Sequence, residues 1–162
     1  MKSFKLLIKP VLDNDKEWVL KFIKKRWGDK RIIYHGKVFY PHKLPGFIAY
    51  QGKEKIGLIT YKINKKVYWV ITIDSLIEKK GIGTALIEAV KKQAKEKRCK
   101  KIKIITTNDN LDAFRFYQKR GFRLKRVYPN AIDKSRLIKP LIPKIGDYGI
   151  PIKDEIELEL VL

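Results

Sequence analysis

The sequence Ile71-Thr-Ile-Asp-Ser-Leu-Ile-Glu-Lys-Lys-Gly-Ile-Gly-Thr-Ala-Leu86 passes from an apolar β-type run, through a short basic loop, to two glycines separated by one residue. A helix is expected to follow, because apolar residues recur at helical spacing over residues 82–93. The first N–H groups of a helix lack internal partners, and the helix dipole adds partial positive charge there. With Lys79 and Lys80 beside it, this turn is predicted to hold a phosphate or pyrophosphate.

Two better-known phosphate-binding motifs are excluded by the same residues. A dinucleotide-binding turn needs a third glycine, and Leu86 stands at that position. No Gly-x-x-x-x-Gly-Lys-Ser/Thr sequence occurs in the chain. Gly81 and Gly83 would let the backbone approach a phosphate closely, although Gly-x-Gly before a helix often serves only tight packing.

A second informative stretch is Thr106-Thr-Asn-Asp-Asn-Leu-Asp-Ala-Phe-Arg-Phe-Tyr-Gln-Lys-Arg-Gly-Phe122. A helix is expected to begin at Asn110 and to stop at the glycine before Phe122. Asn110, Ala113 and Tyr117 would share one face of it, so that an amide and a phenol could point into a crevice beside the preceding strand. A buried aromatic face with a capping asparagine would explain the same pattern.

The remaining periodicities predict one α/β domain over residues 1–162, with a mixed, mostly antiparallel sheet flanked by helices. Short polar breaks separate the second, third and fourth β-type runs, which should therefore pair as antiparallel hairpins. The final run alternates strictly for its first six residues. β-type runs are expected at 4–8, 46–51, 56–63, 67–74, 101–107, 122–128 and 155–162, helices at 13–27, 82–93 and 110–121, and loops at 28–45 and 129–154.

The charge is the unusual bulk property of the chain. Its 38 Lys and Arg residues outnumber 17 Asp and Glu residues, for a formal net charge of +21. Such a field attracts polyanions, but the lysines are spread along the whole chain and specify no site. The single cysteine, Cys99, forms no internal disulfide, so a cytoplasmic location is expected. No apolar run approaches the roughly 20 residues of a membrane helix.

Both informative stretches resemble the GNAT superfamily of N-acetyltransferases. The cofactor signature of that family, Arg/Gln-x-x-Gly-x-Gly/Ala, is similar to residues 78–83 except at the first position, where this chain has Glu78. The later signature, Asn-x-x-Ala-x-x-Phe/Tyr-Tyr-x-x-x-Gly-Phe, matches residues 110–122 without a gap. The order of the predicted elements also fits that fold, so the resemblance covers most of the chain.

The resemblance implies acetyl-CoA as cosubstrate, no metal, and a splay between the fourth and fifth strands in which the pantetheine arm lies. In this arrangement Asn110 would contact the cofactor arm, and Tyr117 would be the general acid that protonates the departing thiolate. The backbone of residues 73–76 would meet the pantetheine and the thioester, and residues 79–84 would hold the pyrophosphate. The implied cofactor-binding residues are Ile73, Ser75, Leu76, Lys79, Lys80, Gly81, Ile82, Gly83, Thr84 and Asn110.

The sequence departs from the family pattern at the general base. Many relatives carry a glutamate on the strand before the glycine loop, where Tyr68 and Trp69 stand here and cannot serve. Asp74 is the nearest acid and is the candidate base, with deprotonation relayed by water as the rival and a turn-forming role as the structural explanation.

The amine acceptor is not specified by the sequence. Loops 28–45, with His35, Tyr40 and His42, and 129–154 are expected to surround it, and their basic surroundings favour an anionic small molecule or an acidic protein surface over a polyamine. A basic RNA- or ribosome-associated module on the same fold, with little catalysis, is the alternative function. A homodimer is also considered, because the alternating final strand could extend a sheet across two copies.

Overall fold

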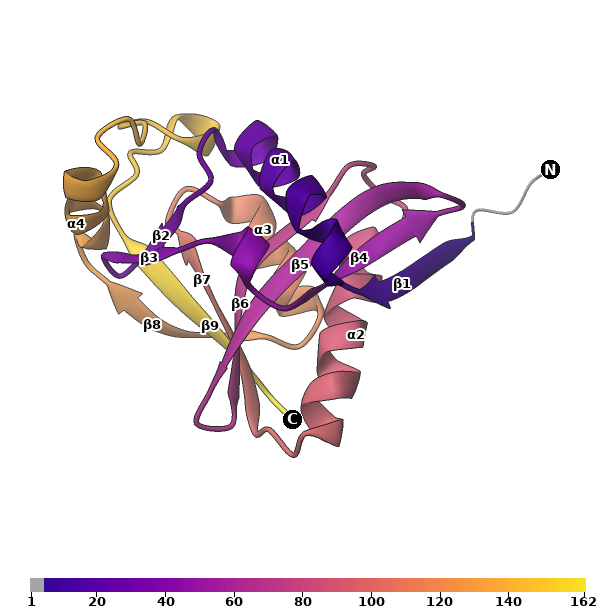
Figure 1. Ribbon diagram of the computed structural model, residues 1–162. Coiled ribbons are helices and arrows are strands. Elements are labelled where there is room, and N and C mark those ends of the chain that lie inside the picture. Colours follow the sequence, from indigo (N-terminus) through magenta and orange to yellow (C-terminus); the bar gives the residue numbers. More distant parts are fainter. Residues whose placement is uncertain (1–4) are drawn as a thin grey trace.

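A seven-stranded sheet in the order β1-β4-β5-β6-β7-β9-β8 organises the computed structural model, which describes residues 5–162 (Figure 1). The pair β6–β7 is parallel and the other neighbouring pairs are antiparallel, which confirms the predicted mixed, mostly antiparallel sheet. The predicted start of the first strand at Phe4 lies outside the described residues. The strands are β1 (Leu6–Pro10), β4 (Gly46–Gln51), β5 (Glu54–Asn64), β6 (Val67–Ser75), β7 (Lys101–Thr107), β8 (Arg123–Tyr128) and β9 (Glu155–Val161).

Helices cover both faces of this sheet. On one face α1 (Lys16–Trp27) buries Val19, Phe22 and Ile23 in a core shared with β4, β5 and β6. On the other face α2 (Ile82–Glu96) and α3 (Leu111–Lys119) pack in a second core. The chain also forms α4 (Ala131–Ile138) and three single turns of 3-10 helix, η1 (Asp13–Asp15), η2 (Pro41–Lys43) and η3 (Asp147–Gly149). No helix within residues 5–162 is both long enough and apolar enough to cross a membrane.

The two segments expected to be loops contain short regular elements. Within 28–45, β2 (Ile32–Tyr34) and β3 (Lys37–Phe39) form a hairpin whose two turn residues, His35 and Gly36, both have positive φ, of 51° and 70°. A two-residue turn with positive φ at both positions suits the twist of a hairpin. The hairpin was not predicted because strands of three residues are too short to show periodicity. In 129–154, α4 fits between Pro129 and Pro140, and the prolines of this segment concealed it.

The last strand is an internal strand of the sheet. β9 pairs with β7 along one edge and with β8 along the other, so both of its edges are already hydrogen-bonded. The prediction that this strand extends the sheet across a dimer is therefore wrong. In the described part of the chain, β1 and β8 are the outer strands of the sheet.

Candidate active site

The sheet splays between β6 and β7. These strands pair only from Val67 opposite Lys101 to Val70 opposite Ile104. Both then continue, β6 to Ser75 and β7 to Thr107, without facing each other. The splay predicted between the fourth and fifth expected strands is confirmed. After Val70, the N–H and C=O groups of β6 that would otherwise bond to β7 point into the gap between the two strands.

A β-bulge in β6 lies where the gap opens. Tyr61 of β5 pairs with Val70 and Thr60 pairs with Thr72, so Ile71 is the extra residue. The Ile71 carbonyl accepts a 3.0 Å hydrogen bond from the phenol of Tyr34, which comes from the β2–β3 hairpin. Burial raises the pKa of Tyr34, and the nearby charges of Asp74 and Glu155 raise it further, so the phenol keeps its proton. Sequence reasoning missed Tyr34, whose only signal is an aromatic residue beside His35.

The glycine loop encloses a hollow of about 310 Å³ at the beginning of α2. Ala85 N–H donates to the Gly81 carbonyl at 2.9 Å, which leaves the N–H groups of Ile82, Gly83 and Thr84 without an acceptor in the helix. The predicted cofactor-binding residues that line this hollow are Ser75, Lys79, Gly81, Ile82, Gly83 and Thr84. They are joined by Ile77, Glu78, Phe116 and Arg120.

The two glycines of the loop serve different purposes. Gly81 has φ 73°, and a side chain built on it would meet no atom within 4 Å, so its Cα faces open space. A Cβ on Gly83 would lie 2.9 Å from Cζ of Phe116. Gly83 is therefore required for packing of α2 against α3, whereas Gly81 fits the predicted close approach of a ligand.

Arg120 is a further basic residue of this hollow that sequence reasoning missed. Its Nε donates to Thr84 Oγ1 and its Nη1 to the Phe116 carbonyl, both at 2.8 Å. Its guanidinium carbon lies 3.6 Å from the centre of the Phe116 ring. These contacts fix the guanidinium beside the start of α2 and leave further N–H donors for an anion. In the sequence, Arg120 was one more basic residue among many, just before Gly121.

The remaining predicted cofactor-binding residues lie around the hollow. The Ile73 side chain packs against the core under α2. The N–H of Leu76 is engaged, because it donates to the Ile56 carbonyl at 2.8 Å, and its side chain is half exposed beside α1. Lys80 is exposed on the loop. Asn110 caps α3: its Oδ1 accepts from Ala113 N–H at 3.2 Å and its Nδ2 donates to Thr106 Oγ1 at 3.0 Å. Both the oxygen and the nitrogen of the Asn110 amide are therefore already hydrogen-bonded within the protein.

Tyr117 is buried in the last turn of α3, where its ring contacts the rings of Phe116 and Phe122. Its hydroxyl makes no hydrogen bond with another described residue. Burial raises its pKa well above the ordinary value, and the neighbouring Tyr34 phenol and the Asp74 carboxylate act in the same direction. Tyr117 therefore holds its proton at neutral pH, as a proton donor must.

Asp74 lies at the end of β6, with a side chain that is only 10% exposed. Its Oδ2 accepts a 3.0 Å hydrogen bond from Nε1 of Trp27, and its Oδ1 is 3.7 Å from Nε of Arg26. Burial raises the pKa of Asp74, while the Trp27 and Arg26 contacts oppose the rise. The carboxylate joins α1 to the splayed strand and faces the same side of the sheet as Tyr34, instead of forming a turn with Ser75.

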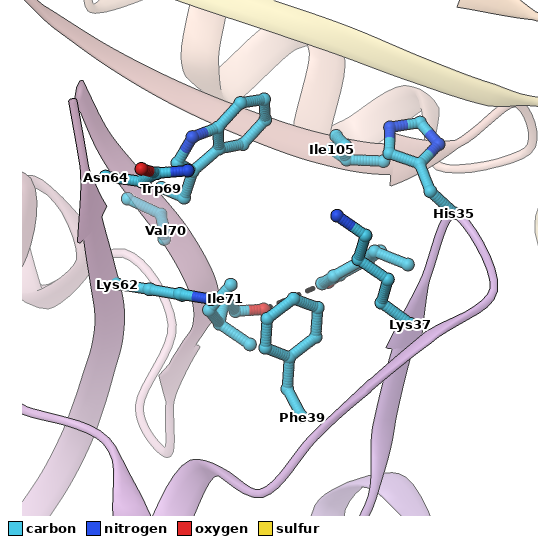
Figure 2. Close-up of a pocket in the computed structure, with 10 residues that line it drawn as sticks. His35, Lys37, Phe39, Lys62, Asn64, Trp69, Val70, Ile71 and Ile105 are labelled. Atoms are coloured by element: carbon cyan, nitrogen blue, oxygen red, sulfur yellow. Dashed lines mark hydrogen bonds between the residues drawn. The ribbon is translucent and has the colours of Figure 1, made fainter.

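A second cavity, called here the acceptor cavity, adjoins the splay on the α1 side of the sheet, where Trp69 and Ile71 of β6 also contact the core under α1. Figure 2 shows the residues that line it. Of the residues predicted to surround an acceptor, His35 reaches this cavity. Tyr40 and His42 instead lie at η2, whose contacts are with α1, and burial lowers the pKa of His42. The cavity is lined by Tyr34, His35, Lys37, Phe39, Lys62, Asn64, Trp69, Val70, Ile71 and Ile105.

The alternating glutamates of β9 are buried on the same side of the sheet. Glu155 accepts from the His35 N–H at 3.1 Å, and burial raises its pKa. Glu157 is 3.3 Å from Lys103, and Glu159 is 3.2 Å from Lys101. Ion pairs with β7 thus cover Glu157 and Glu159, whereas Glu155 contacts the β2–β3 hairpin. No group of three or more His, Cys, Asp or Glu side chains among residues 5–162 is arranged to hold a metal ion.

Comparison with known proteins agrees with this geometry. Residues 14–122 match the model of the acetyltransferase (GNAT) family. The uncharacterized protein YdhI of Bacillus subtilis is 43% identical over 158 residues, covering 97% of this chain and 99% of YdhI. The uncharacterized protein YxbD of the same organism is 41% identical over 150 residues, covering 92% and 94% of the two chains.

Solved structures with little sequence identity share the fold. An acetyltransferase from Bacillus subtilis in complex with CoA has a TM-score of 0.69 at 21% identity and covers 98% of this chain and 99% of its own. A GNAT family acetyltransferase from Elizabethkingia anophelis with acetyl-CoA bound has a TM-score of 0.66 at 22% identity, with 97% and 98% covered. The predicted enzyme class and fold are thus confirmed, and the chain belongs to the acetyltransferase (GNAT) family.

Proposed function

We propose that the chain is an N-acetyltransferase that uses acetyl-CoA and transfers the acetyl group directly to a primary amine. The observation that carries the proposal is the splay of β6 from β7, which has the glycine-loop hollow at one side, the acceptor cavity at the other, and Tyr117 beside it. A gap between strands with unpaired backbone groups suits the extended pantetheine arm of acetyl-CoA. The diphosphate end of the cofactor would then lie in the glycine-loop hollow, and the acetyl end would lie near the acceptor cavity.

The residues of the hollow fit a diphosphate group. Its donors are the free N–H groups at the start of α2, the open backbone at Gly81, and the guanidinium of Arg120. Helix N-termini and bidentate guanidinium groups are the usual protein partners of phosphate. Glu78 opposes binding, because its carboxylate lines the same hollow. Arg120 compensates for it by placing a fixed positive charge nearby.

Acetyl-CoA supplies an activated acetyl group on a thiolate leaving group. The residues of this chain supply two proton transfers. Asp74 removes the proton of the incoming ammonium, directly or through water, because its raised pKa brings a carboxylate closer to the pKa of an amine. Tyr117 donates its phenolic proton to the departing sulfur, and the proton that the attacking nitrogen loses as the amide forms returns through water to the phenolate. Backbone N–H groups of β6 would stabilise negative charge on the carbonyl oxygen.

Titration calorimetry with acetyl-CoA, followed by an assay of CoA release with a panel of amines, tests the proposal. Micromolar binding and amine-dependent release of CoA are expected. Lack of binding at millimolar acetyl-CoA would contradict the proposal, as would binding with no transfer to any amine. Gly81→Val should abolish binding, because a β-branched residue is strained at φ 73° and its side chain would project into the space over the loop.

A further inference from the structure

The acceptor cavity has the size of a single small side chain. Its volume is about 150 Å³. An engineered apolar cavity of about that volume in another protein binds one benzene molecule. The enclosed part of this site therefore holds one six-membered ring or one branched aliphatic group, and it does not hold a linked series of sugar rings.

The walls of this cavity are mainly apolar. Phe39 comes from the β2–β3 hairpin, Trp69 from β6 and Ile105 from β7. The ammonium group of Lys103 lies 5.2 Å from the centre of the Trp69 ring, which helps to hold the indole in place. The bulged residue Ile71 also lines the cavity, so a bound molecule reaches the point where β6 leaves β7.

Positive groups approach this apolar space without a negative partner. Lys37 and Lys62 enter from opposite sides (Figure 2). No carboxylate lies within 4 Å of either ammonium group among residues 5–162, whereas Lys101 and Lys103 on the neighbouring strand are both paired with glutamates. The ammonium of Lys62 instead lies 5.9 Å from the centre of the Phe39 ring. Both lysines are exposed at the mouth of the cavity, so an anion bound between them would be held by charge attraction that added salt weakens.

The same two cations select against other acceptors. They repel a polyamine, and they lower the pKa of an ammonium group bound near them, which favours the neutral amine that attacks the thioester. Within the described part of the chain, no acidic side chain lines the cavity to hold a second cation. A suitable acceptor therefore carries one amine, one anionic group and one compact apolar group.

We infer that the acceptor is a free α-amino acid, or a close analogue, with an apolar side chain of about one ring in size. Its carboxylate pairs with Lys37 and Lys62, its side chain occupies the space between Phe39, Trp69 and Ile105, and its amine points toward Ile71 and the splay. This inference rests on the proposed acetyl transfer and adds the chemical class of the substrate.

Matched pairs of amines test the role of the carboxylate. At saturating acetyl-CoA, kcat/KM is measured for phenylalanine against phenethylamine and for leucine against isoamylamine. Each pair differs only in the carboxylate, so at least a tenfold preference for the acid is expected. In Lys37→Gln, Lys62→Gln and the double variant the preference should fall progressively, to less than about threefold in the last. Lys53→Gln, in the exposed turn between β4 and β5, serves as the control and should keep the full preference.

Each other outcome decides against the inference. Equal turnover of acid and amine within a pair, an unchanged preference in the double variant, or better turnover of a peptide with an N-terminal phenylalanine would overturn it. Calorimetry with acetyl-CoA on the same samples separates the two levels of the argument. If acetyl-CoA binds and amines are acetylated without regard to the carboxylate, only the substrate class is wrong; if acetyl-CoA does not bind, the acetyl transfer itself is wrong.

Discussion

The phenol of Tyr34 donates a hydrogen bond to the carbonyl of Ile71, the one residue by which β6 bulges before it leaves β7. A carbonyl turned away from both neighbouring strands is costly when it is buried without a partner. Tyr34 satisfies it from a hairpin 37 residues earlier in the chain. One contact therefore fixes the shape of the splayed strand and the position of the acceptor cavity together.

Tyr34→Phe is expected to destabilise the protein by about 1–3 kcal/mol, the usual cost of leaving a buried acceptor unsatisfied. Urea unfolding at equilibrium measures this loss. Tyr40→Phe is the matched control, because the Tyr40 hydroxyl makes no hydrogen bond with another described residue. A Tyr34→Phe protein as stable as the control would show that water replaces the phenol at Ile71.

Tyr117→Phe is expected to lower kcat at least tenfold and to leave the affinity for acetyl-CoA nearly unchanged. The substitution removes only a hydroxyl that makes no hydrogen bond with another described residue, so the packing of the ring with Phe116 and Phe122 is kept. Steady-state kinetics and calorimetry measure the two effects separately. Tyr50→Phe, on β4, should behave like the unmodified protein. A normal rate in the Tyr117 variant would exclude this phenol from the mechanism.

Asp74→Asn distinguishes a general base from a structural carboxylate. A raised carboxyl pKa means that the folded state favours the protonated form, so the stabilisation present at low pH is lost as the pH rises through that pKa. At neutral pH the asparagine variant should therefore be at least as stable as the parent, since its amide oxygen can still accept from Trp27.

The activity of the same variant should change in the opposite sense. The parent is expected to lose kcat/KM as the pH falls through the raised pKa of Asp74, because a base must be ionised to act. The variant should be at least tenfold slower and should lack this acid limb. A pH–rate profile together with thermal unfolding gives both results. An unchanged profile would assign deprotonation to water or to another group.

Arg120→Gln is expected to weaken acetyl-CoA binding by about tenfold or more, since a hydrogen bond to a charged group contributes roughly 1.5–3 kcal/mol. Calorimetry measures the change, and raising the salt concentration should reduce it. The exposed neighbour Lys119 provides the control as Lys119→Gln. Equal losses in the two variants would indicate a general effect of charge rather than a specific contact of Arg120.

Glu78→Gln should strengthen acetyl-CoA binding several-fold, because it removes a negative charge from the lining of the hollow where the diphosphate is proposed to lie. The gain should shrink at high ionic strength. Glu88→Gln, outside this hollow on α2, is the control. Weaker binding by the Glu78 variant would mean that the carboxylate orders the loop and does not merely repel the ligand.

Elements with a strong period or a capping residue were predictable from the sequence. β4 and β7 lie at the expected residues, α2 begins directly after Gly81, and Asn110 caps α3. Local pattern suffices there, because the apolar side chains of each element face one core. The splay was predicted only through family resemblance, since the loss of pairing beyond Val70 has no local signal.

Residues whose role depends on distant contacts were not predictable. Tyr34 acts through a strand 37 positions away, and Arg120 through Thr84 on another helix. The alternation of Glu155, Glu157 and Glu159 predicted a strand correctly, but it did not show that these glutamates would be buried inside the sheet. Whether this strand lies inside the sheet or at its edge depends on its pairing with β7 and β8, and sequence periodicity does not reveal strand pairing.

The internal position of β9 constrains the order in which the molecule can assemble. Among residues 5–162, β8 pairs only with β9, and β7 has only its four-residue pairing with β6 until β9 has been made. During synthesis, β1 to β6 and α2 can collapse early, whereas the half that carries Tyr117 must wait for the final strand to emerge from the ribosome and insert between two strands made before it.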